Sequence, residues 1–199
     1  MKKIETIWHE LLYSALQDRR YKHTQQELAN KFNYSLSTVH HALKVPSQIG
    51  ALRKESKFFV LQDFNKLLYY WASFRNLKKD ILYKTYYDGA VTQIEGFAPA
   101  KAIYACYSAA RKLLSEPPAD YDKVYFYIDS KELDKFKQRF PPTDKVSPNV
   151  FALKMLPQME SYGSVTSLPQ AFVDIWNLQD WYGKDFTQTL EEKINGLLS

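Results

Sequence analysis

Apolar residues in the first segment of the chain recur at intervals of three and four. This spacing places them on one face of a helix and predicts an amphipathic helix that packs against other elements. The positions concerned are Ile4, Ile7, Trp8, Leu11, Leu12, Ala15 and Leu16. The polar run QDRRYKH, residues 17–23, ends this helix.

A pair of short helices is predicted within residues 24–44, TQQELANKFNYSLSTVHHALK. In the first helix Thr24 stands three residues before Glu27, a spacing at which each side chain can bond the other's free backbone N–H. The turn after this helix contains Asn33, which tolerates the left-handed backbone conformation. The apolar residues that this helix is expected to bury are Leu28, Ala29 and Phe32.

The second helix of the pair begins at a serine cap, either Ser35 or Ser37. We expect it to end at Pro46, because proline cannot continue the hydrogen-bonding pattern of a helix. Its inward-facing residues are Val39, Ala42 and Leu43.

Two short strands are predicted next, around residues 51–52 and 58–61, joined by the charged tip RKESK, residues 53–57. Residues 63–75, DFNKLLYYWASFR, return to helical spacing with Asp63 as the N-cap. A helix, a capped helical pair and a ribbon with a basic tip form the order of a winged helix-turn-helix. In that fold the second helix of the pair lies in the major groove of DNA.

The rest of the chain alternates between strand and helix patterns, and the change occurs near residues 76–80. We therefore expect a mixed α/β (α+β) protein with a winged helix-turn-helix over residues 1–76 and a mixed α/β domain for regulation or protein contact over residues 77–199. The expected strands of the second domain are 80–89, 122–130 and 149–156, and its expected helices are 91–96, 108–114, an exposed helix over 130–140 capped by Ser130, 167–178 and 183–198.

Charge is distributed unevenly along the chain. Residues 1–79 contain 14 Lys or Arg against 6 Asp or Glu, a net charge of +8, whereas residues 80–199 contain 13 against 16, a net charge of −3. A basic first part on a slightly acidic remainder indicates that only the N-terminal domain faces a polyanion such as double-stranded DNA.

Candidate DNA-contacting residues follow from the helical pattern, because the apolar side of the second helix must pack inward. Hydroxyl and imidazole groups on its outer side can bond base edges or phosphates, and basic residues at the ribbon tip can reach phosphates or a narrow minor groove. On the helix these residues are Ser37, Thr38, His40, His41 and Lys44. On the ribbon they are Arg53, Lys54 and Lys57. One alternative is a helical hairpin with no ligand, and another is an interaction module that uses the winged fold for protein contacts.

Other classes of protein find less support in the sequence. Glu5, His9 and Glu10 interrupt the first apolar run, which excludes a signal-peptide pattern, and no later run is long enough to span a membrane. The single cysteine, Cys106, excludes a disulfide framework within the chain, so we expect a cytoplasmic protein. His40 and His41 point about 100° apart on a helix and cannot both hold one metal ion well.

Catalysis is not expected, because the chain contains no phosphate-binding glycine loop, HExxH or GxSxG motif and no cofactor signature. Glu95, Asp129 and Lys131 could be arranged as a metal-dependent nuclease site, but Asp129 falls where a strand ends and can equally cap the next helix. The tyrosine-rich strands are better explained by a sheet packed on helices than by a platform for single-stranded nucleic acid.

The order of these parts resembles the winged-helix regulators related to the AbiEi antitoxins of abortive-infection systems. The resemblance covers most of the chain and rests on diffuse motifs that follow the winged helix. These are FNKLLYYWASFRNL, PADYDKVYFYID, NVFALKML and LPQAFVDIWNLQDWYGKDFTQTLEEKI, the last of which carries Asp174 in an apolar helix.

This resemblance implies a repressor that binds inverted repeats at its own promoter. It also implies a nucleotidyltransferase-type toxin in the same operon, which the second domain helps to counteract. By position, the DNA contacts would be the helix and ribbon residues given above, and Asp174 would be structural, capping or orienting the last helices. The second domain is not basic, which speaks against its touching DNA as well.

Overall fold

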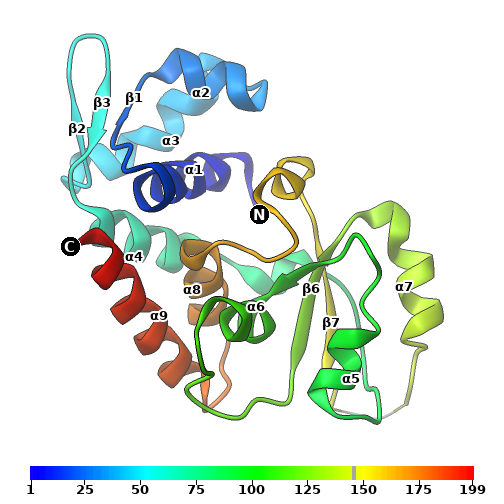
Figure 1. The fold of residues 1–199 in the computed structure, drawn as a ribbon. Helices are drawn as coiled ribbons and strands as arrows, with labels where there is room; N and C mark the ends of the chain where they lie inside the picture. The colour runs from blue at the N-terminus through cyan, green and yellow to red at the C-terminus, as the bar shows by residue number, and fades with distance from the viewer. Residues whose placement is uncertain (145–146) are drawn as a thin grey trace. The chain divides into compact units, whose positions relative to one another are not determined.

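The computed structural model describes residues 1–144 and 147–199 and divides into two compact units. Unit 1 comprises Met1–Arg75 together with Ile194–Ser199, and unit 2 comprises Asn76–Lys193. Helices and strands occur in both units, so the expected mixed α/β class is confirmed (Figure 1).

Unit 1 combines helices with a small antiparallel sheet of strand order β1-β3-β2. Strand β1 was not predicted, because two residues are too few to show a period. Its pairing with β3 makes β3 the central strand of a three-stranded sheet, with β1 and β2 at the edges. The elements are α1 (Lys3–Asp18), β1 (Lys22–His23), α2 (Gln25–Phe32), α3 (Leu36–Gln48), β2 (Leu52–Lys54), β3 (Phe59–Leu61) and α4 (Phe64–Phe74).

Helix α3 was predicted to end at Pro46, but it continues through this residue to Gln48. Proline has no N–H to donate to the carbonyl four residues earlier, which here belongs to Ala42. The indole N–H of Trp8 donates to that carbonyl over 2.7 Å within the buried core. A side chain from α1 therefore satisfies the acceptor that Pro46 leaves without a helical partner, and the helix can continue.

Unit 2 is built on a four-stranded sheet of order β4-β7-β6-β5, in which β6 and β7 are parallel and the other pairs antiparallel. Its strands are β4 (Ile81–Thr85), β5 (Ile103–Ala105), β6 (Val124–Ile128) and β7 (Val150–Lys154). Its helices are η1 (Leu77–Asp80), α5 (Val91–Gly96), α6 (Cys106–Leu113), η2 (Ser130–Glu132), α7 (Leu133–Arg139), η3 (Pro157–Tyr162), α8 (Leu168–Trp176) and α9 (Gly183–Leu198, in unit 2 through Lys193).

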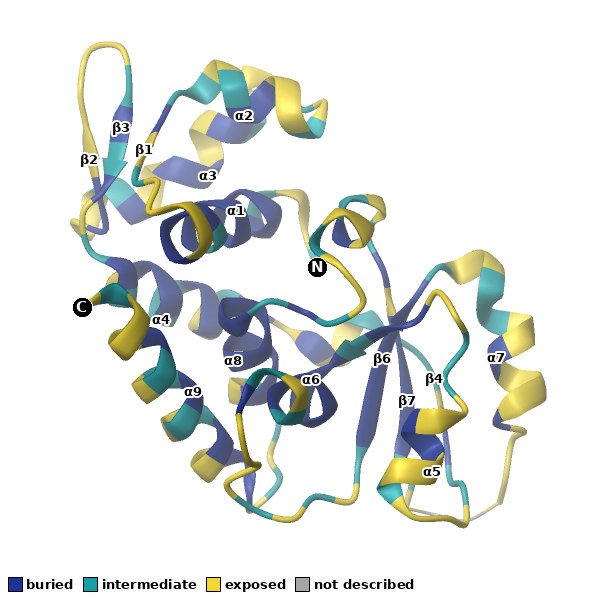
Figure 2. Cartoon of the chain, viewed as in Figure 1, coloured by how far each residue is buried: buried dark blue, intermediate teal, exposed yellow. Residues whose placement is uncertain are grey.

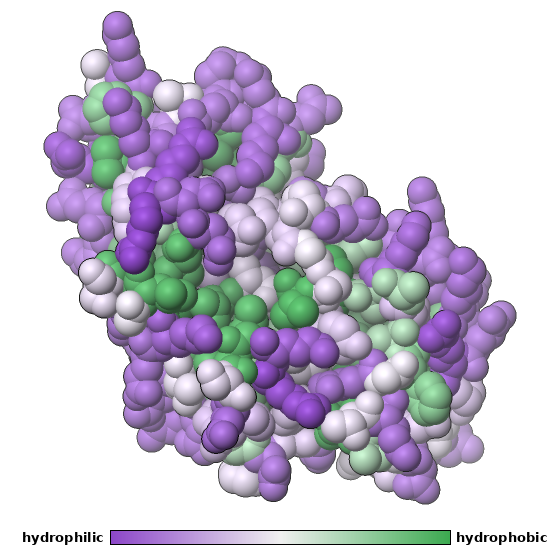
Figure 3. All heavy atoms as spheres, viewed as in Figure 1, coloured by the Kyte–Doolittle hydropathy of each residue, from purple (hydrophilic) through white to green (hydrophobic). Residues whose placement is uncertain are grey.

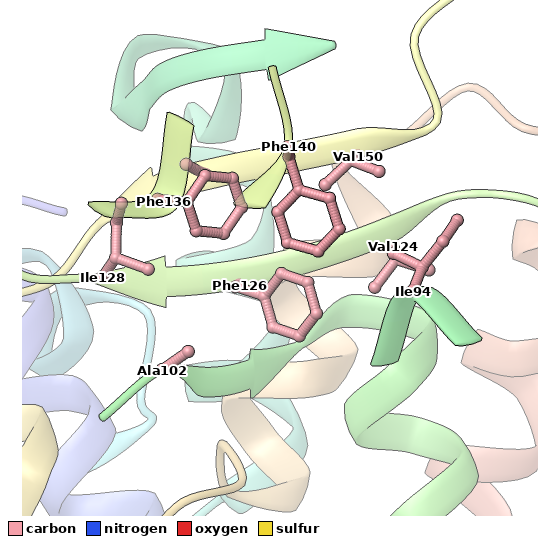
Figure 4. Close-up of a cluster of buried hydrophobic side chains, with 9 residues drawn as sticks. Ile94, Ala102, Val124, Phe126, Ile128, Phe136, Phe140 and Val150 are labelled. Atoms are coloured by element: carbon pink, nitrogen blue, oxygen red, sulfur yellow. The ribbon is translucent and has the colours of Figure 1, made fainter. Parts of the chain in front are cut away.

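Helices cover both faces of this sheet, and every residue of β6 is buried (Figure 2). On one face Phe126 of β6 packs among Ile94 of α5, Phe136 of α7 and Phe140, which follows α7 (Figure 4). On the other face Tyr127 of β6 contacts α8. Burial on both faces explains why VYFYI reads as a continuous apolar run.

The segment 130–140 differs from its prediction in two ways. Asp129, not Ser130, is the N-cap, and its carboxyl group accepts the Lys131 N–H over 3.0 Å. The first turn is the 3₁₀ helix η2, and α7 begins only at Leu133. The helix is also not simply exposed, because Phe136 is fully buried in the core of unit 2.

Candidate nucleic-acid interface

The helical pair of unit 1 is fixed by side-chain caps at both helix starts. The Thr24 hydroxyl accepts the Glu27 N–H over 3.1 Å at the start of α2. Asn33 adopts the left-handed conformation (φ 52°) that ends α2. The Ser35 hydroxyl then accepts the Thr38 N–H over 3.1 Å, so Ser35 and not Ser37 caps α3. These contacts set the angle at which the chain leaves α2 and enters α3.

The buried side of α3 consists of Val39, Ala42, Leu43 and Pro46. Phe32 of α2, which was predicted to be buried, is only half-buried and stacks on Tyr34 with ring centroids 5.7 Å apart. The rest of the predicted core of the pair, Leu28 and Ala29, is buried.

The exposed side of α3 carries a polar stripe. At 100° per residue, Ser37, His41, Lys44 and Gln48 lie in one row opposite the buried side, and all four are exposed. His40 is also exposed but lies on the flank of the helix that contains Leu43. Gln48 was missed from the sequence, because the helix was expected to end before it.

Thr38 is not presented like its neighbours. Its backbone N–H is bonded to Ser35, and its hydroxyl lies 2.9 Å from the Ser35 hydroxyl. The side chain is half-buried. Thr38 therefore completes the cap of α3, and Ser37 is the better placed of the two to contact a ligand.

The register of the ribbon separates two of the predicted basic residues. Lys54 pairs with Phe59 and Arg53 with Val60, and adjacent strand residues point to opposite faces. Lys54 shares the face of the buried Leu52, whereas Arg53 lies on the other face and its Nη1 is 2.8 Å from Glu55 Oε1. Only Lys54 of this pair faces the helices.

A hollow of about 370 Å³ lies where the ribbon meets the starts of α2 and α3. Hydrophilic side chains cover α2 and the ribbon tip on the face shown in Figure 3. Lys54 and Lys57 line the hollow from the ribbon, and Gln25 and Gln26 line it from α2. The two glutamines were not predicted, since no helical period distinguishes them from ordinary surface residues. The other lining residues are Thr24, Leu36, Leu43, Glu55, Ser56, Phe58 and Phe59.

Charge in unit 1 favours an anionic partner at this face. The unit contains 12 Lys or Arg against 6 Asp or Glu, a net charge of +6. Five of its acidic residues are engaged with basic ones: Glu5 with Arg75, Glu10 with Lys31, Glu27 with Arg20 and His23, Glu55 with Arg53 and Asp63 with Lys66. Over residues 1–144 and 147–199, Lys44, Lys54 and Lys57 form no ion pair.

The remaining histidines have structural positions. His23 is buried, its Nδ1 lies 3.1 Å from Glu27 Oε1, and its ring stacks on Phe59. Burial lowers the pKa of His23, with Arg20 acting in the same direction and Glu27 opposing it. Burial also lowers the pKa of His9, to about 4.

The residues considered for a nuclease site each have another contact. Glu95 is buried, and its carboxyl oxygens accept hydrogen bonds from Arg111 at 3.0 Å and from Tyr121 at 2.7 Å. Asp129 caps η2 through the Lys131 N–H. In the described part of the chain, no group of three or more His, Cys, Asp and Glu could hold a metal ion.

Two further residues of unit 2 were singled out in the sequence. Asp174 is fully buried, and its Oδ2 accepts hydrogen bonds from the Tyr127 hydroxyl at 2.7 Å and from Gln170 Nε2 at 2.9 Å. It thus joins α8 to β6. Cys106 is buried at the start of α6 with a positive φ of 49°.

The chain matches no protein-family model, and comparisons with curated proteins and with solved structures gave no match either. Among the described residues, no helix is long and apolar enough to cross a membrane.

Proposed function

We propose that unit 1 is a winged helix-turn-helix that binds double-stranded DNA, and that the protein is a sequence-specific transcriptional regulator acting in the cytoplasm. Helix α3 would lie in the major groove, and the ribbon β2–β3 would be the wing on the neighbouring backbone. The observation that carries the proposal is the position of Lys44, Lys54 and Lys57. They have no acidic partner in the described chain, and they lie on the exposed stripe of α3 and beside the hollow under the ribbon.

The two groups of residues would have different tasks. Lys54 and Lys57 suit phosphates, because a lysine ammonium is a point charge that neutralises one phosphate without reading sequence. Ser37, His41 and Gln48 suit base edges, because hydroxyl, imidazole and amide groups both donate and accept hydrogen bonds. Lys44 lies in the same row and suits a phosphate, and His40 on the flank would contact either bases or the sugar–phosphate backbone.

Selection of duplexes from a random pool tests sequence-specific binding. The wild-type protein is expected to enrich one motif. His41→Ala should change the preferred bases, with a smaller effect on affinity for random duplex, whereas Lys54→Ala should weaken binding to all sequences alike. Arg53→Ala is the matched control, since Arg53 lies on the other face of the ribbon and pairs with Glu55. No enrichment by the wild type would contradict the proposal.

The finer proposal, repression of an operon that encodes a nucleotidyltransferase-type toxin, is supported by the resemblance to AbiEi-type antitoxins alone. In it, unit 2 would serve regulation or protein contact. A gene for such a nucleotidyltransferase beside this one, transcribed together with it and repressed by this protein, is the expected finding. The absence of such a gene nearby, together with no effect of the protein on transcription from its own promoter, would contradict this finer proposal.

A second candidate, protein contact through α3, is favoured by three exposed apolar side chains. Leu36, Val45 and Ile49 are 49%, 36% and 40% exposed. If protein is the partner, replacing Val45 and Ile49 with serine should abolish binding, and the lysine substitutions should leave it intact. If DNA is the partner, the opposite result is expected.

A further inference from the structure

Unit 2 contains a hollow of about 560 Å³ that no part of the proposed DNA interface uses. Its size is within the range of pockets that hold small molecules. It lies near the β4 edge of the sheet, between one face of the sheet and the loop that joins α8 to α9. The lining residues are Lys78, Ile81, Lys84, Lys123, Tyr125, Phe151, Leu178, Gln179 and Asp180.

The floor of the hollow is a row of residues across three strands. Tyr125 of β6 pairs with Phe151 of β7, and Phe151 pairs with Lys84 of β4. Directly paired residues point to the same face of a sheet. The two rings stack with centroids 4.4 Å apart and an interplanar angle of 11°. The faces of the two rings are turned toward each other, so the row presents ring edges to the hollow. Tyr125 and Phe151 are only 3% and 7% exposed and form a rigid apolar floor with a lysine at its end.

Positive charge gathers around this floor, although unit 2 as a whole has 15 Lys or Arg against 16 Asp or Glu, a net charge of −1. Lys78, Lys84 and Lys123 face only one carboxyl group among the lining residues, that of Asp180. Asp180 accepts hydrogen bonds from Lys123 and, over 3.0 Å, from the Tyr107 hydroxyl, so Lys123 is held in place. Lys78 and Lys84 form no ion pair within the described residues.

We propose that this hollow binds a nucleoside phosphate. The phosphate would lie among Lys78, Lys84 and Lys123, since ammonium groups bind phosphate as point charges. The ring would rest on the apolar floor beside Leu178. The amide of Gln179 can both donate to and accept from the edge of a base. A bare phosphate would leave the apolar part of the hollow unused, and a purely apolar ligand would leave two lysines without a counter-charge.

The test is isothermal titration calorimetry of the full chain with AMP, ATP, GTP, adenosine and inorganic phosphate. At least one nucleotide is expected to bind at a single site, at least tenfold more tightly than adenosine or phosphate alone. The double variant Lys78→Ala/Lys84→Ala should weaken that binding at least tenfold. Lys101→Ala/Lys135→Ala removes the same charge from exposed positions of unit 2 outside the hollow and should leave the affinity unchanged.

Three results would overturn the proposal. These are no saturable binding of any nucleotide by the wild type, equal loss of affinity in both double variants, and binding of inorganic phosphate as tight as that of the nucleotides. All four substituted lysines are exposed, so these variants should melt at the wild-type temperature. Because duplex binding is assigned to unit 1, it should be unaffected in either variant, and the two proposals can fail separately.

Discussion

The indole N–H of Trp8 donates to the carbonyl of Ala42 over 2.7 Å, and this carbonyl is the one that Pro46 leaves without a helical donor. Trp8→Phe should lower the free energy of unfolding by about 1–3 kcal/mol, because a buried carbonyl loses its partner. In a Pro46→Ala background the residue at position 46 has its own N–H, so the cost of Trp8→Phe should fall by about 1 kcal/mol. Urea unfolding of the four proteins, followed by circular dichroism, gives this coupling energy. Equal costs in both backgrounds would contradict the explanation of the long helix.

Ser35 and Ser37 provide a matched pair on α3. Ser35→Ala removes the N-cap and should destabilise unit 1 by about 1 kcal/mol. Ser37→Ala removes an exposed hydroxyl and should leave the free energy of unfolding unchanged, but it should alter which duplexes are selected. Urea unfolding and duplex selection on both variants separate the two roles. If both substitutions lower the free energy of unfolding equally, the assignment of Ser35 as the cap is wrong.

His9 makes the stability of unit 1 depend on pH. Burial lowers its pKa from 6.5 to about 4, and Lys31 adds to this lowering while Glu10 opposes it. The unfolded chain therefore binds a proton in a pH range where the folded chain does not. The stabilisation is complete above pH 6.5, falls as the pH drops toward 4, and amounts to about 3 kcal/mol over that window.

Urea unfolding between pH 7.5 and 5 measures the upper part of this window, in which a loss of about 2 kcal/mol is expected. Replacing Trp176 and Trp181 with phenylalanine leaves only Trp8 and Trp71, both in unit 1, as fluorescent reporters. His9→Gln in the same background should lose this part of the pH dependence. If the free energy of unfolding falls equally with pH in the proteins with and without His9→Gln, His9 is not responsible for the pH dependence.

Asp174 should stabilise unit 2 through Tyr127. Tyr127→Phe removes the 2.7 Å hydrogen bond to Asp174 Oδ2 and should cost about 1–3 kcal/mol, since both groups are buried. Tyr125→Phe is the control, because the Tyr125 hydroxyl makes no hydrogen bond within the described chain. Thermal unfolding by circular dichroism should show a clear loss of stability for the first variant only. A similar loss in both would mean that the bond itself contributes little.

Local signals made much of the fold predictable. The helices α1, α4, α8 and α9 are evident from their apolar period and caps, and Asp63 and Ser167 accept the backbone N–H groups of Lys66 and Gln170, as capping residues do. Strands β4, β6 and β7 of unit 2 were also evident, because β-branched and aromatic residues concentrate in them, whereas the three-residue strand β5 was not predicted. Local chemistry is sufficient wherever an element is stabilised by residues close in sequence.

Features that depend on distant residues were not predictable. The end of α3 depends on Trp8, which is 34 residues before Ala42 in the chain. Which of Arg53 and Lys54 faces the helices depends on which face of β2 the fold buries, and that is the face of Leu52. The hollow in unit 2 depends on the neighbouring positions of β4, β6 and β7, which the sequence leaves open. The candidate DNA residues were found by their type and spacing, but their division into cap, base-facing and phosphate-facing groups needed the structure.

The salt dependence of duplex binding tests the central claim most directly. Affinity for the selected duplex should fall with salt, and Lys44→Ala/Lys54→Ala/Lys57→Ala should make the log–log slope shallower by about 2.7, or about 0.9 for each phosphate that is no longer neutralised. The control Lys101→Ala/Lys135→Ala/Lys184→Ala removes the same charge from exposed positions in unit 2 and should keep the wild-type slope. Equal slopes for the two triple variants, or wild-type binding that does not respond to salt, would contradict the assignment of α3 and the ribbon as the DNA-binding surface.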